Sequence, residues 1–259
     1  MNNSNSTRSS LKRNTIASSL YELIMNRSFW LVFTLTVVAF SILVKLGFWQ
    51  LSRADEKQQI EQLLQQRAIK PLVDIDSLKQ GETNYNGLLV SGHLTAIMDK
   101  YLLLDNQTYL GKVGYLALQL MVTQQGQYVL LERGFVEAPL ERTKLPKVEW
   151  LSSDLNVEGR LYQRSSNPMS SDLFFESGDV ARIQNINIDA LSQQWQLSIE
   201  PYVVQPTMVP WPYPQPWSPV PMTSTKHIGY AVQWFGLSIA LLILSSWMLK
   251  KTLCARRPQ

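Results

Sequence analysis

The chain of 259 residues contains little cysteine, little histidine and few charged residues. Its single cysteine, Cys254, cannot pair within the chain, which excludes a small domain held together by disulfides. A structural zinc site, which needs four Cys or His ligands, is not expected from two histidines, His93 and His227. Charged residues make up 17% of the chain against about 25% in ordinary soluble domains. Because 45% of the residues are apolar, disorder over the whole chain is excluded as well.

The signatures of common enzymes are also missing. The sequence contains no Gly-x-Ser-x-Gly motif and no glycine-rich phosphate loop, and its carboxylates are scattered along the chain. There is no basic stripe with interleaved aromatic residues of the kind that binds nucleic acid. We therefore predict a binding protein, with no enzymatic activity and no nucleic-acid partner.

Two long apolar segments stand out, residues 29–49 and 228–249. The first carries one charge, Lys45 near its end, and the second carries none. As helices, each would be ~32 Å long and would cross a hydrocarbon core of ~30 Å. We predict two transmembrane helices in the lipid bilayer; the alternative is a pair of long core helices in a soluble protein. The first segment is too long for the apolar region of a cleaved signal peptide and lacks an Ala-x-Ala-like site, so we interpret it as an uncleaved anchor.

The positive charge is concentrated at the two ends of the chain. Residues 1–28 carry four basic residues and one acid, and the tail after Leu249 carries four basic residues and no acid. Residues 46–227, in contrast, hold 15 basic and 19 acidic residues. By the positive-inside rule both termini are cytoplasmic and the middle lies outside. We predict a multi-pass protein of the bacterial inner membrane with a periplasmic central domain, although the acid-poor start also resembles a mitochondrial transit peptide.

The middle of the chain has the pattern of a small β domain. Residues 52–69 have helical spacing and either continue the first helix or form a short amphipathic helix, which Pro71 ends. Turn signals at Asp105-Asn106, Gln125-Gly126, Asn167-Pro168 and Ser177-Gly178-Asp179 then separate short apolar runs. The predicted strands are 88–94, 101–104, 115–122, 128–136, 155–162, 182–188 and 201–204, with a short helix over 189–198 that Asp189 caps. Of these, Leu102–Leu104 and Val129–Leu131 are typical of central strands buried on both faces.

A proline-rich segment follows the β domain. Residues 206–222 contain seven prolines together with Trp211, Tyr213 and Trp217. This spacing excludes a helix or a central strand, so we predict an extended strap that leads back to the membrane. Its aromatic residues either lie in the interfacial belt or belong to an ordered linker.

The predicted fold class is thus membrane α + β, in which two transmembrane helices flank a small antiparallel β-rich extracytoplasmic domain, a barrel or a sandwich, with one or two short helices. The predicted boundaries are a cytoplasmic segment 1–28, helix 29–49, β domain 50–205, strap 206–227, helix 228–249 and cytoplasmic tail 250–259.

Unusual side chains gather where the two apolar segments leave the membrane on the outer side. His227, Tyr230 and Trp234 share one face of the second helix, and Trp49, Arg53 and Lys57 share one face of the first. A histidine ligand, aromatic surfaces and two cations would suit a flat, apolar, anionic molecule such as a haem. The alternative, which composition alone favours, is that the aromatic residues are interfacial anchors and the cations meet lipid headgroups.

Four motifs in order resemble the surfeit-locus-protein-one family. They are Gly47-Phe48-Trp49-Gln50-Leu51-Ser52-Arg53 with Lys57, Leu104-Asp105-Asn106 with Gly111 and Gly114-Tyr115, Val129–Val136 with Glu132-Arg133-Gly134, and His227–Phe235 with Tyr230-Ala231 and Trp234. The chain has Phe135 where the family usually has tryptophan, Thr225-Lys226 where an Asn or Asp often precedes the histidine, and an unusually long strap.

The resemblance implies an assembly factor for a haem-copper terminal oxidase, chiefly cytochrome c oxidase. It implies transient binding of haem a, with His227 as the axial ligand of the haem iron, and insertion of the haem into subunit one. In this interpretation Trp49, Tyr230 and Trp234 line the haem and Arg53 and Lys57 face its propionates. The implied partners are subunit one and haem a synthase. The alternative function is a cofactor-free scaffold that holds a subunit-one intermediate through residues such as Arg133, Trp211 and Trp217.

Overall fold

The computed structural model describes residues 25, 27–78, 84–141, 144–163, 172–216, 218 and 220–255. The chain forms two compact units. One comprises Met1–Ile60 and Met222–Gln259, and the other comprises Glu61–Pro221. The predicted turn at Asn167-Pro168 and the residue Trp217 lie outside the described residues.

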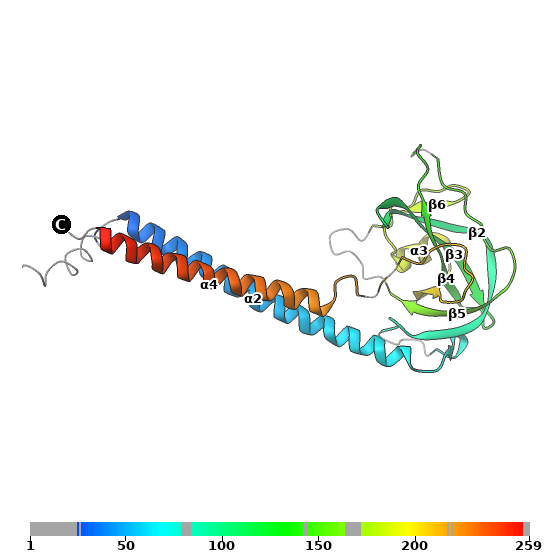
Figure 1. Cartoon of the computed structure of the whole chain (residues 1–259). Coiled ribbons are helices and arrows are strands. Elements are labelled where there is room, and N and C mark those ends of the chain that lie inside the picture. The colour runs from blue at the N-terminus through cyan, green and yellow to red at the C-terminus, as the bar shows by residue number, and fades with distance from the viewer. Residues whose placement is uncertain are drawn as a thin grey trace, which may run out of the picture. The chain divides into compact units, whose positions relative to one another are not determined.

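Two long helices build the first unit, and one of them continues past Ile60 into the second unit. They are α2 (Arg27–Ala68) and α4 (Ser224–Ala255), which lie side by side in opposite directions (Figure 1). Both are long and apolar enough to cross a membrane. Only 6% of the apolar window of α2 and 11% of that of α4 are buried. A core helix of a soluble protein would bury most of this surface, so the exposure favours the transmembrane alternative.

The helix α2 continues well beyond its apolar segment. Its polar second half, from Ser52 to Ala68, belongs to the same helix, which confirms the first of the two alternatives for residues 52–69. The helix ends shortly before Pro71, as expected from the missing N–H and the fixed φ of proline.

The second unit is built on one sheet, whose strands are β1 (Val73–Asp74), β2 (Leu89–Tyr109), β3 (Lys112–Thr123), β4 (Tyr128–Glu137), β5 (Leu155–Tyr162), β6 (Ala181–Ile183) and β7 (Ile199–Pro206). A short 3₁₀ helix, Ile75–Ser77, follows β1, and the helix α3 (Ile188–Trp195) precedes β7.

The sheet closes on itself. Its strands pair in the order β2-β3-β4-β7-β5, and β5 also pairs with β2. The result is a barrel, visible in Figure 1, rather than a sandwich. The expected antiparallel order holds for most of this ring, but β4 and β7 are parallel, as are β1 and β6 with β2. The parallel β4–β7 pair arises because a long connection containing β5, β6 and α3 separates these two strands in the sequence.

The predicted strands 88–94 and 101–104 are parts of the single strand β2. An irregularity in its pairing with β3 lies between Ala96 and Tyr101, where Asp99 has a φ of 61°. The predicted turn at Asp105-Asn106 is therefore wrong; these residues form a second irregularity inside β2, and the chain turns at Leu110-Gly111. Asn106 adopts a φ of 57°, which asparagine tolerates better than most residues, so its turn-like sequence serves a bulge.

Two further predictions are corrected at the end of the domain. The strand expected over 182–188 is confined to β6, and Ile188 begins α3. The N-cap of α3 is Asn187 and not Asp189, because the side chain of Asn187 accepts the N–H of Ala190 at 3.0 Å. Either residue type can cap a helix, so composition alone did not identify the right one.

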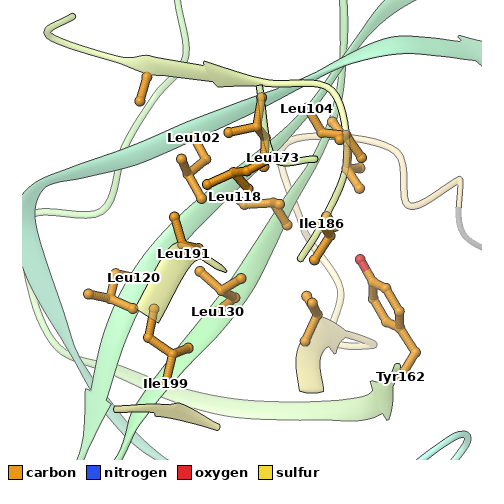
Figure 2. Packing of buried hydrophobic residues seen from close by; sticks show 14 residues of the cluster. Leu102, Leu104, Leu118, Leu120, Leu130, Tyr162, Leu173, Ile186, Leu191 and Ile199 are labelled. Atoms are coloured by element: carbon orange, nitrogen blue, oxygen red, sulfur yellow. The ribbon is translucent and has the colours of Figure 1, made fainter. Parts of the chain in front are cut away.

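The core lies on both faces of the sheet. Leu102–Leu104 and Val129–Leu131 are completely buried, which confirms that these runs are two-sided central strands. On one face, alternate residues of β2, β3 and β4 converge with Leu191 of α3, as Figure 2 shows for Leu118 and Leu130. On the other face, Val129 and Leu131 pack with residues that include Trp211 of the strap.

Candidate functional site

Small residues bring α2 and α4 into close contact. Gly47 and Ala54 are buried on α2, and Ala231 and Ser238 are buried on α4. A Cβ atom on Gly47 would lie 2.6 Å from Cε1 of Phe235, so only glycine allows the ring to pack there. Such small residues at a helix–helix contact are typical of membrane helix pairs.

His227 lies in this contact, in the first turn of α4. Only 8% of its surface is exposed, and its Nδ1 lies 2.7 Å from Oε1 of Gln50 on α2. Its other ring nitrogen, Nε2, has no hydrogen-bond partner among the described residues. The imidazole is therefore held through one nitrogen while the other keeps its bonding capacity.

The other predicted residues of α4 flank His227. Tyr230 is 42% exposed and Trp234 is partly buried. Both positions are one to two turns further along the helix than His227 and on the same side of it, as their spacing predicts. They offer aromatic surface on the C-terminal side of His227 along α4.

The predicted residues of α2 differ from one another in exposure and in their contacts. Trp49 is 49% exposed, and the guanidinium of Arg53 lies 5.8 Å from the centre of its ring. Arg53 also forms an ion pair with Glu56 at 2.6 Å. Lys57 is partly buried and forms no ion pair with any residue in the described ranges.

The two sets nevertheless occupy one side of the helix pair. With about 100° per residue and antiparallel helices, Arg53 and Lys57 fall on the same flank of the contact as Tyr230 and Trp234. The level of each residue follows from the contacts Gln50–His227 and Gly47–Phe235. Arg53 and Lys57 lie at the level of His227 or further toward the C-terminal end of α2, and the aromatic residues lie on the opposite side of His227. The flank therefore has a positively charged end, which suits an anionic group, and an apolar end.

Gln50 was not among the predicted site residues, although it belongs to the first motif. Its spacing contains the missing signal: Gly47, Gln50 and Ala54 follow one another at i, i+3 and i+7 and so share one face of α2. The face with two small residues is the one that can approach another helix, and Gln50 is its polar member.

His93 has a structural role in the barrel. Its Nδ1 lies 2.9 Å from Oδ1 of Asn156, and its Nε2 lies 3.2 Å from Oδ2 of Asp154. The hydrogen bonds to Asn156 and Asp154 raise the pKa of His93. Both ring nitrogens are engaged, and no group of three or more potential metal ligands occurs among the described residues.

The Glu132-Arg133-Gly134 motif anchors the strap. Arg133 is the extra residue of a β-bulge, since Leu118 pairs with Glu132 and Ala117 with Gly134. Its guanidinium lies 4.7 Å from the ring centre of Trp211, whose Nε1 donates to the carbonyl of Arg133 at 2.8 Å. Arg133 is only 4% exposed, which removes it as a direct contact for a partner protein.

Tyr213 of the strap also packs on this bulge. A Cβ atom on Gly134, whose φ is 122°, would lie 2.6 Å from Cβ of Tyr213 and 2.7 Å from the carbonyl oxygen of Pro214. The hydroxyl of Tyr213 accepts the N–H of Glu149 at 2.8 Å. Trp211 and Tyr213 thus pack on the barrel, as the ordered-linker alternative expects.

A buried carboxylate lies next to this bulge. Glu132 is fully buried; Tyr162 donates to its Oε2 at 2.5 Å and Gln205 to its Oε1 at 3.1 Å. Arg160 in turn donates to Gln205 at 2.5 Å. Burial lowers the pKa of Arg160, and the charge of Glu132 opposes that shift. This network is a satisfied polar core and has the features of a structural element.

The surface of the barrel has an open hollow of about 430 Å³, lined by residues that include Glu176, Asp179 and Arg182. Within it Arg182 forms an ion pair with Glu176 at 2.5 Å, and it also contacts Asp105, outside the lining, at 3.9 Å.

Comparison with known proteins agrees with the motifs. The chain matches the SURF1 family over residues 37–239. It is similar to a SURF1-like protein of Rickettsia felis, with 24% identity over 80% of this chain and 92% of that protein. It is also similar to a SURF1-like protein of Rickettsia bellii, with 25% identity over 80% of this chain and 86% of that protein. The chain therefore belongs to the SURF1 family, which is associated with the assembly of cytochrome oxidase.

Proposed function

We propose that this protein is a non-enzymatic assembly factor that binds haem a transiently and aids its insertion into subunit one of a haem-copper oxidase. The observation that carries the proposal is the hydrogen bonding of the His227 imidazole. Its ring is oriented by Gln50 at one nitrogen and keeps Nε2 for a ligand. A neutral imidazole nitrogen is the usual protein ligand of haem iron.

The side chains around His227 fit a haem. Tyr230 and Trp234 offer aromatic surface for a planar macrocycle, and Lys57 and Arg53 offer positive charge for carboxylates. Because Arg53 already pairs with Glu56, we assign the larger share of this role to Lys57. Trp49, which is about half exposed, would contribute at the edge of the site.

A single histidine suits a cargo that must leave again. When bound, a haem would supply an iron that can take the imidazole of His227 as its ligand. His227 would be the one protein ligand from this chain, and subunit one would supply the ligand that replaces it. A haem with two protein ligands from this chain would dissociate more slowly.

The proposed topology follows from the two exposed apolar helices and the charge distribution. Both termini would lie in the cytoplasm of a bacterial cell, and the barrel would lie in the periplasm. His227, at the start of α4, would then be at the outer surface of the inner membrane, within reach of subunit one and of haem a synthase.

The proposal is tested by oxidase maturation in cells. The chromosomal gene is replaced by His227→Ala or, as a matched control, His93→Ala, and subunit one is then isolated. We expect His227→Ala to lower the haem a content of subunit one to the level of a gene deletion, and His93→Ala to leave it near wild type. Full haem a content in the His227→Ala strain would favour a cofactor-free scaffold.

A further inference from the structure

The contact between Gln50 and His227 joins the two helices at the site. The 2.7 Å distance between Oε1 of Gln50 and Nδ1 of His227 is a hydrogen-bond distance. We infer that Gln50 is a positioning residue that fixes the tautomer of His227, with the proton on Nδ1 and the lone pair on Nε2. This inference rests on the proposed function, in which Nε2 binds the haem iron.

The chemistry of the pair determines which nitrogen carries the proton. A carbonyl oxygen of an amide only accepts hydrogen bonds, so the ring nitrogen that it contacts must donate. Because a neutral imidazole has one N–H, donation from Nδ1 leaves Nε2 as the nitrogen that can bind a metal. A partner at the non-ligating nitrogen is what orients metal-binding histidines in general.

Burial makes the hydrogen bond an effective constraint. His227 is 8% exposed, and Gln50 is partly buried between the positions of Gly47 and Ala54, the two buried residues of α2. Little water can therefore compete for Nδ1. Since the two residues come from opposite helices, the hydrogen bond also couples the orientation of the ring to the packing of the helix pair.

The amide is better suited to this place than a carboxylate. Glutamate at position 50 would accept the same hydrogen bond but would add a charge next to an apolar segment, which is costly. It would also make the imidazole a stronger ligand. A neutral acceptor fixes the tautomer and keeps the ligand weak enough for a cargo that is passed on.

The first test measures the tautomer without any haem. The chain has only two histidines, so a His93→Gln variant with ¹⁵N-labelled histidine reports on His227 alone. The spectrum is recorded with the full chain in detergent at mildly alkaline pH. We expect Nδ1 to give the signal of a protonated nitrogen and Nε2 that of an unprotonated one. A protonated Nε2 in this protein would overturn the inference.

The second test measures haem a affinity of the full chain in detergent. Loss of the acceptor in Gln50→Met should weaken binding by about 10- to 100-fold, the usual effect of removing the partner of a metal-bound histidine. Gln50→Glu should restore it, and the matched control Gln58→Met, at an exposed position of the same helix, should leave it unchanged.

The outcomes separate the two proposals. If His227→Ala binds haem a as tightly as wild type, the proposed function fails. If His227→Ala loses haem a but Gln50→Met keeps the wild-type affinity, only the role of Gln50 is overturned. If Gln50→Met and Gln50→Glu are equally impaired, helix packing and not the hydrogen bond explains the loss, which also overturns the inference.

Discussion

The ring of Phe235 on α4 packs directly over Gly47 on α2. Cε1 and Cζ of the ring lie 2.6 Å and 2.7 Å from the place where a Cβ atom on Gly47 would be. The ring also forms an edge-to-face contact with Phe48, with 5.3 Å between the ring centres. On α2 this contact lies about one turn from Gln50, and on α4 about two turns from His227, so it sets the spacing of the helices close to that pair.

Enlarging this glycine should separate the helices. We expect Gly47→Val to destabilise the helix pair by about 1–3 kcal/mol, the usual effect of overpacking. The matched control is Gly236→Val on α4, where an added Cβ meets no atom within 4 Å. Thermal unfolding in detergent measures both variants, and equal melting temperatures would contradict the close contact.

A second glycine tests the anchoring of the strap. Gly134→Ala places a methyl group against Tyr213 and Pro214, whereas Gly111→Ala, also at a positive φ, meets no atom within 4 Å. Gly111→Ala should cost about 1 kcal/mol for its left-handed backbone, and Gly134→Ala about 2 kcal/mol more. Urea unfolding gives these values, and proteolysis should cut the strap faster in Gly134→Ala alone. Equal losses would mean that the strap does not pack on the bulge.

The buried carboxylate should be a large contributor to barrel stability. Glu132→Leu leaves Arg160 without its charged neighbour and should lower the free energy of unfolding by about 3–5 kcal/mol. Replacing the exposed Glu158 by leucine should change it by less than about 0.5 kcal/mol. Adding Arg160→Met to Glu132→Leu should recover part of the loss in urea unfolding. No recovery would show that the two charges are uncoupled.

His93 should make barrel stability depend on pH. Its hydrogen bonds with Asn156 and Asp154 raise its pKa above that of the unfolded chain. The folded state therefore binds the proton more tightly, so this stabilisation is full below about pH 6.5 and is lost as pH rises through the folded pKa. The melting-temperature difference between wild type and His93→Gln should shrink between about pH 5 and pH 9. A difference that grows with pH would contradict this sign.

The elements of the fold were largely accessible from the sequence. The composition of runs such as Leu102–Leu104 and Val129–Leu131 identifies buried strands. The length of the two apolar segments identifies the two long helices. The strand pairing was not accessible, because the parallel β4–β7 pair joins segments separated by β5, β6 and α3. The length of β2 could not be predicted either. Its two irregularities, near Asp99 and at Asn106, have the local sequence of turns.

The site was accessible only in part. Helical spacing placed His227 with Tyr230 and Trp234, but on the facing helix the aromatic and basic side chains favoured the face of Trp49 over the face of Gln50. That choice depends on which face of α2 packs against α4, and Gly47 and Ala54 determine this by their size. Likewise, Arg133 had the composition of an exposed recognition residue, and only its stacking on Trp211 identifies it as part of the interior.

The central claim, that His227 holds haem a, is tested most directly by a visible absorption spectrum with haem extraction. Wild-type protein and His227→Ala are purified in detergent from cells that make haem a. We predict nearly one haem a per wild-type chain and almost none in His227→Ala. Equal haem a in both proteins, or none in the wild type while it still co-purifies with subunit one, would contradict the account.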